Sequence, residues 1–281
     1  MMRSLYSGVT GLRNHQTRMD IIGNNIANVN TIGYKGSRVI FQDIYSQTLR
    51  PASGANGTAN GGTNPQQIGL GSTLATIDVM HTRAAAQYTG NVLDLSIEGD
   101  GYFVLSSAGR QTYTRAGNFY TDVNNNLVNS NGLFVQGYYI DPTTEVPNTD
   151  TTAHPLQNIV ISPQYYDVTI DKNGAVVGLD RTTNAKHIIG QIALATFGNE
   201  SALEKIGQNM YRNTANSGAP TLNIPGTGGA GQLNPGTLEM SNVDLAQEFT
   251  DMIVTQRGFQ ANSRIITTTD QMLEELVNLK R

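Results

Sequence analysis

The 281-residue chain contains no cysteine, and only 14% of its residues are charged. Without cysteine it can form no disulfide, no thiolate metal site and no cysteine nucleophile. The formal net charge of −4 provides no strong basic field that would attract nucleic acid or an anionic membrane. Disulfide-stapled scaffolds, cysteine-dependent enzymes and strongly cationic binding proteins are therefore excluded.

Long hydrophobic runs are also missing. No apolar stretch approaches the roughly 18 residues that a membrane-spanning helix needs. Residues 1–20 contain an early arginine but no continuous hydrophobic segment, so they do not read as a cleavable secretory signal. We therefore expect no membrane insertion, and export, if it occurs, requires a route without a cleaved signal peptide.

Motifs for catalysis or cofactor binding are weak. Gly226, Gly228 and Gly231 match the letters of a dinucleotide fingerprint, but Pro225 precedes them and Asn234-Pro235-Gly236 follows, so neither the strand nor the helix that this site needs is present. The chain has no G-x-S-x-G elbow and no phosphate loop. A flexible loop is the better interpretation of the glycines.

Metal-binding patterns are similarly incomplete. The stretch that begins at Asp122 starts like a calcium loop, but Leu127 and Leu133 stand where glycine and glutamate are needed, which favours a polar hairpin turn. The histidines, His15, His81, His154 and His187, have no metal-ligand spacing. We predict a non-enzymatic protein with no catalytic residue, no cofactor and no metal.

Apolar residues repeat at heptad spacing in the N-terminal segment. They are Leu5, Leu12, Met19 and Ile26, then Ile22 and Val29 as a second row, with Val9 beside it. This period predicts a long helix with one apolar stripe, weakest at Gly8 and His15. Asn24, Asn25 and Asn28 crowd its end, and Gly33 offers a left-handed stop.

The C-terminal segment carries a matching pattern. Its apolar row is Leu245, Met252, Phe259, Ile266 and Leu273, widened by Phe249, Leu276 and Val277. Upstream, Ser241-Asn242-Val243-Asp244 reads as a variant capping box, with Ser241 as N-cap and Asp244 in place of the usual glutamate or glutamine. The pattern predicts a helix of ~35 residues, ~50 Å long.

The two heptad patterns predict that the chain ends pack together as a coiled-coil hairpin. Their outer faces carry Asn, Gln, Thr and small residues rather than the lysine–glutamate mixture of a water-facing helix. Such faces suit contact with other copies of the chain, which favours subunit assembly. The alternative is that the apolar stripes form the core of a monomer.

The middle of the chain has a different composition. Residues 50–75 are rich in Gly, Asn, Ser and Thr and predict a mobile connector. Strand patterns follow, with a hairpin expected at Asp100-Gly101, a β-turn at 171–174 and a short helix at 201–207. We therefore predict an α+β fold with three parts: residues 1–30 plus 238–281 as a helical inner domain, 31–75 as an extended connector, and 76–237 as a β-rich outer domain.

Three blocks of sequence resemble one known family. GNNIANVNTIGYKGSR (23–38) is similar to the signature of flagellar axial proteins, the rod and hook subunits, and includes Tyr34 and Lys35. LDLSIEGDGYFVL (93–105) with YTRAGNFYTD (113–122) resembles their central motif. Residues 238–273 resemble their C-terminal helix, so the blocks occur in order and cover nearly the whole chain.

The resemblance implies a structural subunit of the bacterial flagellum that polymerises helically with copies of itself. It further implies neighbouring axial proteins, a rod or hook cap and the flagellar type III export apparatus as partners. Residues 1–49 look most like shorter hook proteins, whereas residues 190–220 are similar to distal rod protein. The sequence favours the hook, the universal joint, over the rod. Alternatives of other classes are an enzymatic or carbohydrate-binding β-domain with helical tails and a helical adhesin or pilus-like subunit.

Overall fold

The computed structural model describes residues 2–54, 62–107, 109–140, 147 and 155–279. The chain divides into two compact units, each built from segments that are distant in the sequence. Unit 1 contains residues 1–27, 37–80 and 243–281, and unit 2 contains residues 28–36 and 81–242. The two ends of the chain therefore belong to one unit, and most of the middle belongs to the other.

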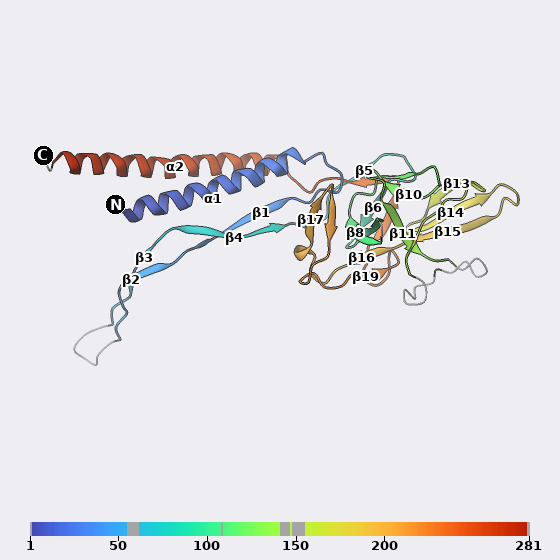
Figure 1. The fold of residues 1–281 in the computed structure, drawn as a ribbon, viewed down its shortest axis with the longest axis horizontal. Coiled ribbons are helices and arrows are strands. Elements are labelled where there is room, and N and C mark those ends of the chain that lie inside the picture. Colours follow the sequence, from blue (N-terminus) through green and yellow to red (C-terminus); the bar gives the residue numbers. More distant parts are fainter. Residues whose placement is uncertain (1, 55–61, 108, 141–146, 148–154, 280–281) are drawn as a thin grey trace. The chain divides into compact units, whose positions relative to one another are not determined.

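Unit 1 consists of two long helices and a β-ribbon (Figure 1). Helix α1 (Met2–Ala27) and helix α2 (Leu245–Asn278) run side by side in opposite directions. The ribbon pairs β1 (Ser37–Asp43) with β4 (Ser72–Val79) and β2 (Ser46–Arg50) with β3 (Gln66–Gly69), all antiparallel. Strands β1 and β4 pack along α1, where Asn14 Nδ2 donates to Ser72 Oγ at 2.9 Å.

Unit 2 is built almost entirely from short strands. They are β5 (Ala86–Tyr88), β6 (Leu95–Glu98), β7 (Tyr102–Ser107), β8 (Arg110–Thr114), β9 (Phe119–Thr121), β10 (Leu127–Asn129), β11 (Phe134–Tyr138), β12 (Gln157–Asn158), β13 (Tyr165–Ile170), β14 (Ala175–Asp180), β15 (Lys186–Ile192), β16 (Leu194–Thr196), β17 (Glu204–Gly207), β18 (Met210–Arg212), β19 (Thr221–Asn223), β20 (Gln232–Pro235) and β21 (Thr237–Glu239). A 3₁₀ turn, Glu200–Ala202, precedes β17.

One sheet of thirteen strands organises unit 2. Its main path runs β13-β14-β15-β11-β7-β8-β18-β17, and every pairing is antiparallel. Two-stranded sheets form from β20 with β6 and from β21 with β5, which join the two ends of the insert. Strand β7 is central and buries alternate side chains on both faces: Phe103 and Leu105 enter the main core, and Tyr102 and Val104 enter a second, aromatic core with Tyr113 and Tyr211.

The predicted α+β class is confirmed, and two predicted turns are present. The turn at 171–174 closes with a bond from Gly174 N–H to Asp171 O and joins β13 to β14. The polar turn after Asp122 joins β9 to β10 and places Asn125 at a φ of 61°. Residues 225–231 form loop structure, as expected from the flanking prolines.

Two local predictions in unit 2 are wrong. Asp100-Gly101 does not close a hairpin, because β6 pairs with β20 and β7 pairs with β8, β11 and β16. Gly99 instead packs so closely on Gly231 that a Cβ atom there would lie 2.5 Å from its Cα. Of the short helix expected at 201–207, only residues 201–202 are helical, within the 3₁₀ turn Glu200–Ala202. Glu204–Gly207 are strand β17, and Gln208 and Asn209 form a left-handed turn that returns the chain as β18.

The predicted domain limits differ from the observed units. Residues 37–54 and 62–80 form the β-ribbon of unit 1 rather than a separate connector, because β1 pairs with β4 and β2 pairs with β3. Residues 28–36 group with the β-rich unit. The centre of the expected mobile stretch, residues 55–61, lies outside the described residues. Neither helix in the described part is long and apolar enough to cross a membrane.

Candidate assembly site

Helices α1 and α2 of unit 1 meet along a seam. Helix α2 contributes two rows of side chains to it, one apolar and one polar. In α2 the burial pattern repeats at 248, 252, 255, 259, 262, 266, 269 and 273, spaced by four and three residues. Met252, Phe259, Ile266 and Leu273 form one row, as the predicted heptad placed them. The alternate row is polar: Glu248, Thr255, Asn262 and Thr269. The seam is therefore only half apolar, which makes it weaker than a heptad with two apolar rows.

Glycines let the two helices approach closely. A Cβ atom on Gly8 would contact Ile266 at 3.3 Å, and one on Gly11 would lie 2.5 Å from Asn262 Nδ2. Gly258 of α2 faces the imidazole of His15, which a Cβ atom would meet at 2.7 Å. The apparent weak places of the N-terminal heptad, Gly8 and His15, are thus contact positions where small and large residues alternate.

Asn25 joins three elements of unit 1. Its side chain is buried, with Nδ2 donating to Ser37 O at 2.8 Å and to Glu248 Oε1 at 2.9 Å, while Oδ1 accepts from Ser37 N–H at 3.0 Å. The amide thus binds the start of β1 as a neighbouring strand would, and also binds α2. Burial raises the pKa of Glu248, an effect partly opposed by the bond from Asn25. These bonds explain why an asparagine stands at this position near the end of α1: its amide is buried and is used in contacts with β1 and α2.

Several predicted seam residues lie elsewhere. Leu5, Leu12, Met19 and Ile26 are partly buried and Ile22 is buried, but Val9 lies at the exposed edge. Val29 follows the end of α1 and belongs to unit 2. Leu245, Phe249 and Leu276 are on the exposed surface of α2. Leu245 is the first residue of the helix, and Phe249 stands beside Glu248, which takes the seam position there.

The exposed surface of α2 is strongly apolar. Large side chains there are Leu245, Phe249, Ile253, Val254, Ile265, Met272, Leu276 and Val277, with Phe249 51% and Val277 66% exposed. On α1, Met2, Tyr6 and Val9 are also exposed. Exposed apolar side chains in such number are typical of a surface that another protein chain covers.

Helix α2 is capped by a different residue from the one predicted. Asp244 is the N-cap, and its carboxylate accepts hydrogen bonds from Ala246 N–H at 2.9 Å and Gln247 N–H at 3.5 Å. Ser241 precedes the helix by too many residues to cap it. Asn242 instead accepts from Gly36 N–H at 2.8 Å, so part of the predicted capping box holds another segment of the chain.

Gly33 is required by close packing rather than by a helix stop. Helix α1 ends at Ala27, and Asn28 accepts from Thr31 in the turn that follows. Gly33 lies beyond this turn at a φ of +67°, and a Cβ atom there would be 2.7 Å from the backbone nitrogen of Ala116. Asn24 remains on the exposed surface of α1. The signature after Asn28 therefore anchors the chain within unit 2.

Lys35, near the end of this signature, forms a buried ion pair. Its Nζ lies 2.6 Å from Glu239 Oε1 and donates to Thr82 O at 2.8 Å, and its side chain is fully buried. Arg115 Nη1 lies 3.5 Å from Glu239 Oε2, and the guanidinium stacks over the Tyr102 ring at 5.1 Å. Burial lowers the pKa of Lys35, while the charge of Glu239 opposes that shift. Nearby, Lys205 lies over the Tyr34 ring at 4.9 Å.

His81 lies close to these charged residues, and its imidazole is neutral. Its Nδ1 lies 2.6 Å from the Tyr102 hydroxyl, and its Nε2 is buried with no hydrogen-bond partner among the described residues. Burial, followed by the charges of Lys35, Arg115 and Lys205, lowers the pKa of His81 to about 4. Burial also raises the pKa of Tyr102 well above its usual range, so the phenol stays protonated.

The lowered pKa of His81 predicts acid sensitivity of unit 2. The unfolded chain takes up the proton near pH 6.5 and the folded chain near pH 4, so this contribution to stability is complete above pH 6.5 and falls as the pH drops towards 4. The slope is up to about 1.4 kcal/mol per pH unit. Between pH 7 and pH 4.5, the melting temperature of His81→Gln, measured by calorimetry, should fall less than that of the wild type. His187→Gln, at a different site on β15, should not; equal slopes for wild type and His81→Gln would contradict the assignment.

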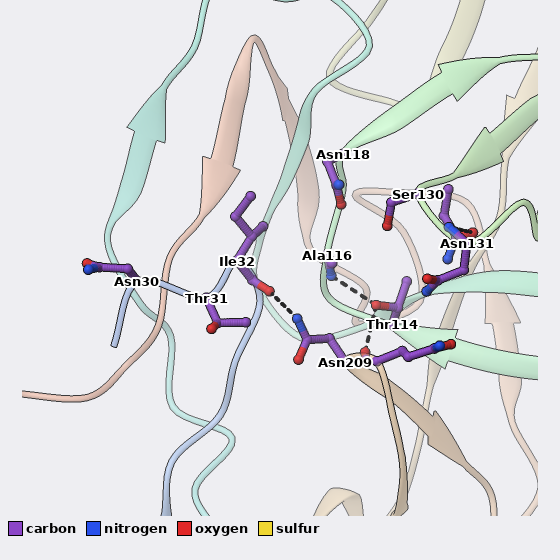
Figure 2. A pocket seen from close by; sticks show the side chains of 11 residues that line it. Asn30, Thr31, Ile32, Thr114, Ala116, Asn118, Ser130, Asn131 and Asn209 are labelled. Carbon is purple, nitrogen blue, oxygen red and sulfur yellow. Dashed lines mark hydrogen bonds between the residues drawn. The ribbon is translucent and has the colours of Figure 1, made fainter. Parts of the chain in front are cut away.

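A polar pocket of about 300 Å³ lies in unit 2 beside the signature segment (Figure 2). Asn209 Nδ2 donates to Ile32 O at 2.9 Å, and Thr114 Oγ1 donates to Asn209 O at 2.8 Å. Amide and hydroxyl side chains dominate the lining, and none of its eleven residues is charged or aromatic. The pocket can hydrogen-bond a polar group, and its lining contains no ionisable side chain.

The three described histidines, considered in the sequence as possible metal ligands, belong to different parts of the fold. Among the described residues no group of three His, Asp or Glu side chains could hold a metal ion. His15 lies in the helix seam, His81 in unit 2 and His187 on β15, while His154 lies outside the described residues.

Both chain ends thus belong to one unit whose helices expose an apolar surface, and a β-rich unit is inserted between them in the sequence. Three family models match in the same order. They are the flagella basal body rod protein over residues 5–35, the flagellar hook protein FlgE/F/G D1 domain over 96–178, and the flagellar basal body rod FlgEFG protein C-terminal over 234–279.

Curated relatives match over the full length. The flagellar basal-body rod protein FlgG of Bacillus subtilis is 50% identical over 282 residues, covering all of both chains. The FlgG of Agrobacterium fabrum is 37% identical, covering 96% of this chain and 97% of its own. The flagellar hook protein FlgE of Borreliella burgdorferi is 31% identical, again covering all of both chains. The chain belongs to the family of flagellar rod and hook proteins.

The comparisons favour the rod over the hook, contrary to the preference drawn from the sequence. Alignment with the B. burgdorferi hook protein runs over 443 positions although this chain has 281 residues, so that hook protein carries extra segments. Alignment with the B. subtilis rod protein needs only 282 positions. Residues 5–35, within the part of the sequence that resembled hook proteins, match the family model of the flagella basal body rod protein.

Proposed function

We propose that this chain is a structural subunit of the distal flagellar rod, the straight drive shaft of the basal body, and not of the hook. The observation that carries this proposal is the match in both identity and length to rod proteins. The alignment with the longer hook relative, over 443 positions against the 281 residues of this chain, supports it. The role is structural, because the helix surfaces and the buried links offer contacts rather than chemistry.

The exposed surface of α2 provides contacts for other copies of the chain. Phe249, Ile253 and Val254 near the start of the helix, and Ile265, Met272 and Leu276 towards its end, each expose apolar area that water solvates poorly. In a helical polymer these side chains would be covered by the helices of neighbouring subunits. Adjoining axial proteins and a rod cap are proposed as further partners, and the type III apparatus of the flagellum as the route of export.

Deletion of the gene tests rod against hook. Cells that lack a distal rod subunit should carry a shortened rod and no hook, because each axial structure is built on the one beneath it. Cells that lack a hook subunit should keep a full-length rod. Electron microscopy of isolated basal bodies distinguishes the two results, and restoration by the wild-type gene provides the control. A complete rod in the deletion strain would contradict the proposal.

A further inference from the structure

Three segments of unit 2 lie next to places where the chain passes between the two units. Gly36 is the last residue of the first segment, His81 the first of the second, and Asn242 the last of the third. We call residues 33–36, 81–85 and 239–242 the linking segments. All three segments are bonded to one another within unit 2, so they are not independent of each other where the chain leaves this unit.

Charged and amide side chains make these bonds. Glu239 Oε1 accepts from Lys35 Nζ at 2.6 Å and from Ala84 N–H at 3.3 Å, and Lys35 Nζ also donates to Thr82 O. Asn242 accepts from Gly36 N–H and donates to Thr82 Oγ1 at 2.9 Å. Each linking segment thus bonds to both of the others through a side chain.

Backbone bonds reinforce the same arrangement. Gly33 N–H donates to Glu239 O at 2.8 Å, and Met240 N–H donates to Ala85 O at 3.0 Å. Lys205, from β17, donates through Nζ to Lys35 O at 2.7 Å. The amides of Gly33, Gly36, Ala84 and Met240 therefore report directly on whether the linking segments stay together.

Three charged side chains at these contacts are almost completely buried. The side chains of Lys35, Arg115 and Glu239 are 0%, 1% and 3% exposed. Glu239 is the carboxylate placed between the two cations, so removing its charge leaves two buried positive groups without their counter-ion. Breaking such a pair is strongly destabilising, whereas replacing the whole pair by apolar residues is often neutral. Stability alone therefore does not require these charges, but directional bonding of the segments does.

We propose that Lys35, Glu239 and Arg115 form a charged clasp that fixes the three linking segments in one arrangement. Glu239 is its centre, because its Oε1 accepts hydrogen bonds from Lys35 and the Ala84 amide, and its Oε2 forms an ion pair with Arg115 at 3.5 Å without a hydrogen bond. In a subunit under load, the clasp keeps the linking segments from separating or sliding past one another. The clasp rests on contacts within unit 2 and holds whether the polymer is rod or hook.

Hydrogen exchange of the full-length chain, followed by mass spectrometry, tests the clasp. Glu239→Gln keeps the shape of the side chain and removes its charge, so the linking-segment amides should exchange about 100-fold faster, while β7 stays protected. Glu204→Gln, which weakens the exposed ion pair to Arg212 at 2.6 Å, is the matched control and should leave these amides unchanged. Wild-type exchange in Glu239→Gln would overturn the proposal.

A second variant separates the clasp from general stability and remains informative if Glu239→Gln does not fold. Lys35→Met, Arg115→Met and Glu239→Leu together replace all three buried charges by apolar side chains. We expect a melting temperature close to that of the wild type but at least tenfold faster exchange at Ala84, whose amide loses its acceptor. Full wild-type protection of the linking segments in this triple variant would show that packing, not the charges, holds them, and would overturn the proposal.

Discussion

Gly117→Ala should prevent unit 2 from folding. Gly117 lies between β8 and β9, and its carbonyl accepts from Leu95 N–H at 3.0 Å. A Cβ atom would lie 1.8 Å from Leu95 O and 3.2 Å from the Phe103 ring. Leu95 and Phe103 are fully buried in the main core, so neither can yield. We expect a loss above about 4 kcal/mol, seen as an insoluble or protease-sensitive chain.

Gly198→Ala is the matched control for this substitution. Gly198 is also in unit 2, has no positive φ, and has no heavy atom within 4 Å of the position that a Cβ atom would take. Its variant should fold normally, with a small gain from the reduced freedom of the unfolded chain. A Gly117→Ala chain that melts within about 3 °C of the wild type would show that the contact with Leu95 is not tight.

Phe259→Asp should abolish polymerisation while unit 2 stays folded. Phe259 belongs to the apolar row of the α1–α2 seam, which has few such positions because the alternate row is polar. The substitution removes about 1.5–3 kcal/mol of apolar burial. It also places a carboxylate in the seam without a partner. We expect export of the subunit, no assembled rod and no motility, measured by immunoblotting of the medium, electron microscopy and swimming assays.

Phe259→Leu provides the control, because it keeps an apolar side chain in the same row and should assemble. Calorimetry of purified Phe259→Asp should still show the melting transition of unit 2, since the substitution lies in unit 1. Normal rods built from Phe259→Asp would mean that assembly does not require the α1–α2 seam. Leu245→Asp tests the neighbouring exposed surface, where the same loss of assembly is expected without loss of the α1–α2 seam.

The sequence predicted the helices well because their period is long and regular. Four of the five residues in the C-terminal apolar row line the seam, and α2 has 34 residues against ~35 expected. The polar row escaped prediction because Glu248, Thr255, Asn262 and Thr269 share the heptad but not the hydrophobicity. A search for a seven-residue repeat of any residue type beside the apolar row would have found them.

Contacts between distant segments could not be predicted from local patterns. Ser241 satisfies the letters of an N-cap, but the helix begins after Asp244, because Asn242 is held by Gly36 and Thr82. Lys35 was singled out only by family resemblance; its partner Glu239 is 204 positions away and belongs to another signature block. Asp100-Gly101 carried a hairpin signal, yet the close approach of Gly231 determined its conformation. The preference for the rod over the hook could be drawn only by comparing this chain with relatives of known length.

The position of this chain in the flagellum tests the central claim most directly. A short epitope inserted at the exposed turn 181–184, which joins β14 to β15, can be labelled with gold on isolated hook–basal bodies. Motility of the tagged strain verifies that the subunit still assembles. A distal rod subunit predicts gold at the straight shaft below the hook, and none along the hook. Label distributed along the curved hook would contradict the account.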